Sequence, residues 1–88
     1  MRLSRISFRA WLAAKPVAEI VGVSDHDEDC PLARFVGAIV CHDAIHSVDG
    51  NHRYSLPKWA SDFIAVVDKH TRTEITAARA LKILDAIP

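Results

Sequence analysis

The stretch "SDHDEDCPLARFVG", residues 24–37, places a block of acidic residues before a cysteine, a proline and a largely apolar segment. The apolar side chains that follow Pro31 have the i, i+3, i+4, i+7 spacing of a single helix face: Leu32, Phe35, Val36 and Ile39. Proline is tolerated in the first turn of a helix, where its missing N–H needs no partner. The pattern therefore predicts a helix over residues 30–41, with Asp29 or Cys30 at the N-cap.

Three further helices are predicted on either side of this segment. The first covers residues 4–14, where Ser4 caps the helix and Leu3 and Phe8 take the two positions of a hydrophobic staple. Another begins at Leu56-Pro57, and the last follows Thr76 as its cap. The apolar face of the third helix is wide, which indicates either a central helix or one that also packs on a partner: Trp59, Phe63, Ile64, Val66 and Val67.

Two other segments have the composition of strands. "VAEIVGV", residues 17–23, predicts a short strand, and residues 44–56 predict a hairpin that turns at Asp49-Gly50-Asn51. The expected order is α-β-α-β-β-α-α. We therefore expect a single compact α+β domain over residues 1–88, with four helices packed on a small, mostly antiparallel sheet.

The charged residues are balanced in number but unevenly placed. Eleven basic and eleven acidic side chains give a formal net charge of zero, which disfavours a dedicated nucleic-acid binder. A stripe of arginines at i, i+3, i+7 on the first helix is expected to face water and to be available to an acidic partner: Arg2, Arg5 and Arg9. The acidic block supplies the other candidates for a protein interface: Asp25, Asp27 and Glu28.

Zinc and disulfide sites are disfavoured by the helix prediction. His26-x3-Cys30 and Cys41-His42-x3-His46 resemble the two halves of a zinc site. A helix over 30–41 would hold the two cysteines about 16 Å apart, beyond the reach of one zinc ion or of a disulfide. Asp25-x-Asp27-x-Asp29 begins like a calcium loop, but the glycine and the bidentate glutamate of such a loop are missing. We expect no metal, cofactor or catalytic residue.

Two opposing effects act on the ionisation of the Cys30 thiol. The N-terminus of a helix favours the thiolate, whereas the neighbouring carboxylates disfavour it. No family signature pairs this cysteine with a histidine base. We therefore expect Cys30 to be a small buried residue, and a Cys30-dependent enzyme or redox sensor, with His26 or His46 as its partner, is the alternative.

The chain is expected to be cytoplasmic. No stretch approaches the roughly 20 apolar residues of a membrane span, and two cysteines do not make a secreted disulfide scaffold. Residues 1–15 contain arginine and serine and lack acids, which is also typical of a transit peptide, so that alternative stays open.

Short motifs are distributed along nearly the whole chain: Phe8-Arg9-Ala10-Trp11-Leu12, Val21-Gly22, Cys30-Pro31-Leu32-Ala33, Leu56-Pro57-Lys58-Trp59-Ala60-Ser61-Asp62-Phe63-Ile64 and Ile75-Thr76-Ala77-Ala78-Arg79-Ala80-Leu81-Lys82-Ile83-Leu84. With these motifs the sequence resembles a family of small, uncharacterised bacterial proteins of the cyanobacterial type. The resemblance implies one intact domain, and it assigns no activity and no catalytic residue.

The leading hypothesis for function is a non-enzymatic protein-binding module. Such a domain would act as a small inhibitor or adaptor on a larger bacterial protein, and a homo-oligomer is compatible with it. An inhibitor of a bacterial defence system, encoded by a phage or mobile element, is suggested only by analogy of size. A weak nucleic-acid contact through the arginines of the first helix is a further alternative.

Overall fold

The structure, a computed structural model, describes residues 3–26, 28–40, 44–47, 53–69 and 73–88. Within these residues the elements follow in the order α1 (Arg5–Ala13), β1 (Ile20–Val23), α2 (Pro31–Val36), β2 (Ile39–Val40), β3 (Ala44–His46), β4 (Arg53–Ser55), α3 (Lys58–Val67), β5 (Glu74–Thr76) and α4 (Ala77–Ala86). The predicted α+β class is confirmed. The predicted elements occur in the predicted order, with the short strands β2 and β5 added between them.

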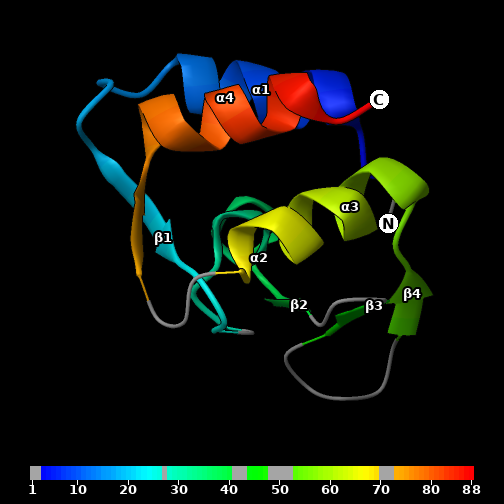
Figure 1. Cartoon of the computed structure of the whole chain (residues 1–88). Coiled ribbons are helices and arrows are strands. Elements are labelled where there is room, and N and C mark those ends of the chain that lie inside the picture. The colour runs from blue at the N-terminus through cyan, green and yellow to red at the C-terminus, as the bar shows by residue number, and fades with distance from the viewer. Residues whose placement is uncertain (1–2, 27, 41–43, 48–52, 70–72) are drawn as a thin grey trace.

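Figure 1 shows the helix pair α1 and α4 at one end of the molecule and the sheet β2–β3–β4 at the other. Helices α1 and α4 are side by side at one end, and α3 lies between α4 and the sheet β2–β3–β4. The two-stranded ladder of β1 and β5 runs along one side and connects these layers. The predicted single sheet is therefore two small antiparallel sheets.

Helix α1 begins and packs as its sequence predicts. The Ser4 hydroxyl accepts a hydrogen bond from the Ser7 N–H at 3.2 Å, which satisfies one of the unpaired donors of the first turn. Phe8 and Leu12 are completely buried, and Leu3 packs against the same core. Both halves of the predicted staple therefore contact the core.

Helix α2 is shorter than predicted. It ends at Val36 because Gly37 adopts the left-handed conformation, with φ of 69°, and its N–H donates a hydrogen bond to the Ala33 carbonyl at 2.8 Å. Ile39 belongs to strand β2, where it is paired with His46. The prediction of a helix through residue 41 is therefore wrong, because the spacing of Ile39 matches a helix face that the glycine has already interrupted.

The ladder of β1 and β5 joins two distant parts of the chain. The predicted strand at 17–23 is reduced to Ile20–Val23, and its partner β5 was not predicted. The paired positions are Ile20 with Thr76, Gly22 with Ile75, and Val23 with Glu74. Ser24 continues the ladder, because its N–H donates to the Thr73 carbonyl and its hydroxyl accepts from the Thr73 N–H, both at 2.8 Å.

The predicted hairpin over residues 44–56 is confirmed in its strands. Strands β3 and β4 are antiparallel, with Ile45 opposite Tyr54 at the centre of the ladder. The predicted turn at Asp49-Gly50-Asn51 lies outside the described residues. Strand β2 adds to the free side of β3, so the hairpin forms part of a three-stranded sheet.

Gly22 lets strand β1 approach the start of α2 closely. A Cβ atom at this position would lie 2.5 Å from the Pro31 backbone nitrogen and 2.7 Å from the Cys30 carbonyl carbon. Real Cβ atoms do not come so close to backbone atoms, so any side chain here would push strand and helix apart. The Val21-Gly22 and Cys30-Pro31 segments, separate in the sequence, therefore form one contact.

The core is centred on aromatic rings from three helices. Phe8 of α1 is completely buried. The centroid of its ring lies 5.2 Å from that of the Phe35 ring and 5.3 Å from that of the Phe63 ring. Trp11 and Trp59 stack on the same ring at about 6 Å. The wide apolar face of α3 is thus explained by a central position, with four of its residues buried: Ala60, Phe63, Ile64 and Val67.

Substituting the two described glycines should affect the protein in different ways. We expect Gly22→Ala to cost about 1–3 kcal/mol or more, because the new methyl group overlaps backbone that cannot move without separating β1 from α2. We expect Gly37→Ala to cost about 1–2 kcal/mol, because open space surrounds Gly37 but its left-handed backbone disfavours a side chain. Urea unfolding gives both values.

The matched control is Gly37→Asn, since asparagine tolerates the left-handed conformation better than alanine. It should be less destabilising than Gly37→Ala. Backbone amide shifts of β1 and α2 should change in Gly22→Ala and stay near their original values in both Gly37 variants. A Gly22→Ala protein as stable as the wild type would contradict the close approach.

Candidate functional site

Arg5 is bound to the end of another helix. Its guanidinium donates hydrogen bonds to the carbonyl oxygens of Leu84 and Ile87, both at 2.7 Å, and to that of Pro88 at 3.1 Å. The last carbonyls of a helix have no partner within the helix and carry partial negative charge. Arg5 therefore caps α4 and ties it to α1.

Arg9 is also paired with α4, but at the surface. Its guanidinium binds both carboxylate oxygens of Asp85, at 2.8 Å and 3.0 Å, and about half of each side chain is exposed. This hydrogen bond and the positive charge of Arg9 hold the pKa of the Asp85 carboxyl below its usual value. Arg2 lies outside the described residues.

These contacts correct one expectation about the arginine stripe. Arg5 does not simply face water, because both of its Nη atoms donate to carbonyl oxygens of the fold. Substitution of Arg5 should consequently weaken the α1–α4 contact. That Arg9 belongs to a protein interface stays a prediction.

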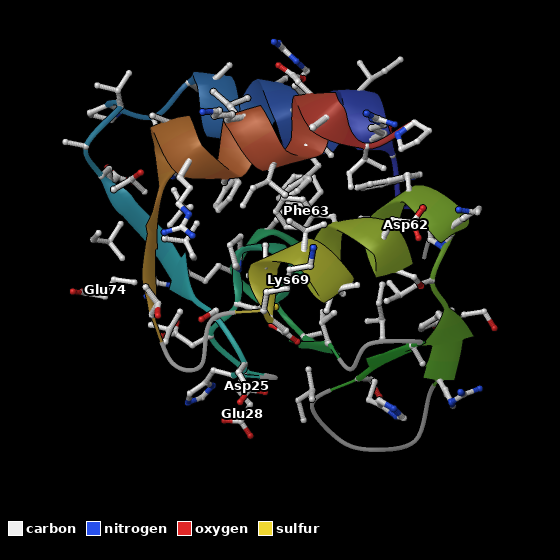
Figure 2. All side chains as sticks on the ribbon, in the orientation of Figure 1. Asp25, Glu28, Asp62, Phe63, Lys69 and Glu74 are labelled. Atoms are coloured by element: carbon white, nitrogen blue, oxygen red, sulfur yellow. The ribbon has the colours of Figure 1, made fainter. Side chains whose placement is uncertain are left out.

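Two residues of the acidic block, Asp25 and Glu28, are exposed and lie far from the helix pair. Figure 2 shows Asp25 and Glu28 next to each other, at the end of the molecule opposite α1 and α4. Asp25 has a left-handed backbone, with φ of 54°, and its N–H donates to Asp68 Oδ1 at 2.8 Å. Asp27 lies outside the described residues. The two predicted groups of interface residues therefore do not form one surface.

Arg34 and Asp29 connect this loop to the fold. The Arg34 Nε donates to Asp29 Oδ1 at 2.6 Å, and its Nη1 donates to the Ile20 carbonyl of β1 at 3.2 Å. The hydrogen bond from Arg34 lowers the pKa of Asp29 below its ordinary value, although partial loss of hydration acts in the opposite direction. The pair thus positions the start of α2 beside β1.

Cys30 has a structural role at the start of α2. It is the N-cap residue, its side chain is 5% exposed, and its Sγ accepts a hydrogen bond from the Ala33 N–H at 3.4 Å. The Cys30 N–H donates to the His26 carbonyl at 2.9 Å, and the Nδ1 of His26 is buried with no hydrogen-bond partner among the described residues. Burial keeps the sulfur from large substrates. That the chain is not an enzyme stays a prediction.

The zinc hypothesis involves residues outside the described part of the chain. Cys41 and His42 lie outside the described residues. The predicted separation of about 16 Å between the two cysteines depended on a helix that in fact ends at Val36. Within the described residues, no three or more histidine, cysteine or acidic side chains converge where they could hold a metal ion. The absence of a metal stays a prediction.

An apolar groove lies between α3 and α4. It has a volume of about 500 Å³. One wall is Val66 of α3, and the other consists of residues of α4 and its C-cap: Arg79, Lys82, Ile83, Ala86 and Ile87. Figure 2 shows Phe63 between these two helices, where it belongs to the buried core. Val66 and Ile83 are only partly buried, so apolar side chains remain open to solvent here.

Sequence reasoning did not identify this groove. The signal was present on the last helix, where four lining residues have the i, i+3, i+4, i+7 spacing of a second face beside the core face: Arg79, Lys82, Ile83 and Ala86. The sequence did not identify Val66 of α3 as the opposite wall of the groove. Periodicity within one helix does not indicate which helix packs beside it.

A second hollow is found next to the acidic loop. It has a volume of about 410 Å³ and is lined by Glu28, Ala33, Arg34, Gly37, Ala38 and Ile39. Its one described cation, Arg34, is already paired with Asp29. This hollow is more polar than the groove, so the groove is the more apolar of the two surfaces.

Comparisons with protein-family models, with curated proteins and with solved structures found no match to this chain. The resemblance to small bacterial proteins noted from the sequence motifs stays a prediction. None of the described helices has the length and apolar character that crossing a membrane requires.

Removing the Arg5 side chain should destabilise the protein. We expect Arg5→Ala to cost about 1–2 kcal/mol, because three carbonyl oxygens at the end of α4 lose a charged donor. Arg9→Ala is the matched control on the same helix, and its exposed ion pair should contribute much less. Urea unfolding gives both values, and equal stability of the two variants would contradict the capping role.

The Arg34–Asp29 pair predicts a dependence of stability on pH. Because the folded protein holds the Asp29 pKa below that of the unfolded chain, the pair contributes stability above about pH 4 and loses it as the pH falls through the lowered pKa. Both side chains are more than one third exposed, so the contribution should be at most about 1 kcal/mol.

The Asp29 carboxyl carbon can be titrated by NMR in the wild type and in Arg34→Gln. The pKa of Asp29 should rise toward its ordinary value in the variant. Stability of the two proteins should differ near neutral pH and converge in acid. An unchanged Asp29 pKa in Arg34→Gln would show that the hydrogen bond is absent in solution.

Proposed function

We propose that the chain is a non-enzymatic protein-binding module that acts as an adaptor or inhibitor by docking on a larger protein. The observation that carries this proposal is the apolar groove between α3 and α4. Its walls belong to two helices whose other faces are held in the core, so the groove is an established feature of the fold rather than a gap left by a loop.

The chemistry of the groove supports binding of another protein. Surface apolar groups that are grouped in a groove and bordered by charge are typical of interaction sites. Here Val66, Ile83 and Ile87 provide the apolar part and Arg79 and Lys82 the polar border. By contrast, Cys30 caps α2, Asp29 is paired with Arg34, and Asp68 accepts a hydrogen bond from the Asp25 N–H.

Filling the groove tests this function. Ala86 is exposed and lines the groove, so Ala86→Arg would place a long side chain there without removing a positive charge. Ala10→Arg is the matched control, an exposed alanine on α1 that does not line the groove. Both variants should keep the circular dichroism spectrum of the wild type, since exposed substitutions usually cost within about 0.5 kcal/mol.

The binding experiment begins with capture from a lysate of the source cells and identification of the retained protein by mass spectrometry. Affinity for that protein, once purified, is then compared between variants. We expect Ala86→Arg to weaken binding by tenfold or more and Ala10→Arg to bind like the wild type. Failure to retain any protein, or equal binding by the two variants, would contradict docking through the groove.

A further inference from the structure

The charges around the groove identify the kind of partner that fits it. Arg79 and Lys82 are exposed, and neither side chain has an acidic partner within ion-pair distance among the described residues. No acidic side chain lines the groove in that part of the chain. The border of the groove is therefore positive, on a chain whose net charge is zero.

The acids of the neighbouring helices do not neutralise this border. Asp62 of α3 is paired with Lys58 at 2.7 Å, and Asp85 of α4 is paired with Arg9. Asp68, which follows α3, accepts the hydrogen bond from the Asp25 N–H. Each of these carboxylates is bound to another group of the fold, so none of the three pairs with Arg79 or Lys82.

The groove also has the shape of a helix-binding surface. Its lining residues on α4 extend from Arg79 to Ala86, which is about 10 Å or two turns at 1.5 Å per residue. Peptide helices dock in such grooves through apolar side chains at i, i+3, i+4 and i+7, which occupy a similar length. Two positive groups beside the apolar part then favour carboxylates on the flank of the bound helix.

We propose that the groove binds an amphipathic helix of a partner protein whose apolar face is flanked by glutamate or aspartate residues. This rests on the proposed docking function and specifies the chemistry of the partner. A second copy of the chain fits less well, because the acids of its described helices are paired and its exposed Asp25 and Glu28 lie in a loop.

The probe is a fluorescent peptide of about 15 residues, long enough to form a helix when bound, with leucines at i, i+3, i+4 and i+7 and glutamates beside them. A second peptide carries lysine in place of every glutamate. Fluorescence anisotropy should show tenfold or tighter binding of the glutamate peptide, and the difference should shrink when the salt concentration is raised.

Charge reversal at the groove provides the specific test. Lys82→Glu should weaken binding of the glutamate peptide about tenfold and strengthen binding of the lysine peptide, because the sign of one border charge is reversed. Arg53→Glu is the matched control, an exposed arginine on β4 that does not line the groove. It should leave the preference between the peptides unchanged. Thermal unfolding confirms that both variants are folded.

The outcomes separate this inference from the proposed function. Suppose that Ala86→Arg weakens binding of both peptides equally while Lys82→Glu changes the affinity for neither. The groove then binds proteins, but the proposal that its partner is acidic is wrong. If Ala86→Arg has no effect on either peptide, both the inference and docking through the groove are overturned.

Two other occupants are tested with the same reagents. Concentration-dependent dimerisation that Ala86→Arg abolishes would assign the groove to a second copy of the chain. Displacement of the glutamate peptide by micromolar dodecanoate would assign it to a small anionic amphiphile. Either result would contradict the proposed helix, and absence of both, together with the charge reversal, supports it.

Discussion

Burial of the Phe8 ring is the contact on which the arrangement of the helices depends. The ring is completely buried and lies against Phe35 of α2 and against Trp59 and Phe63 of α3. It thus positions α1 against two other helices, and the Arg5 guanidinium then fixes α4 against α1. Because α3 and α4 are each held by these contacts, the groove between them has walls that are set by the core. A binding surface formed in this way needs little reorganisation before a partner docks, which reduces the entropic cost of binding.

Much of the fold could be predicted because its signals are local. The caps Ser4 and Thr76 and the helical spacing of apolar residues identified α1, α3 and α4, and strand-forming residues on both sides of a turn signal identified the hairpin. The end of α2 was misplaced because Gly37 can either be tolerated in a helix or end it, and only the backbone decides. Strand β5 was missed because its three residues pair with a strand far away in the sequence.

The candidate sites were harder to predict, since each depends on contacts between distant elements. Helical spacing placed Arg5 and Arg9 on one face of α1, but it could not show that α4 ends beside Arg5 and offers Asp85 to Arg9. The same limit hid the groove, whose two walls come from separate helices. Two of the arginines that the sequence places on one stripe are already bound within the chain, since Arg5 donates to carbonyl oxygens and Arg9 is paired with Asp85. The cations Arg79 and Lys82 gain significance only among the described neighbours that surround them.

The measurement that tests the account most directly is a map of amide chemical shifts during titration with the glutamate peptide. Resonances of the groove should move first and furthest, those of Val66, Lys82, Ile83 and Ala86 among them. Resonances of the acidic loop around Asp25 and Glu28 should stay in place. Shifts centred on that loop, or scattered over the whole surface without saturation, would contradict a docking groove between α3 and α4.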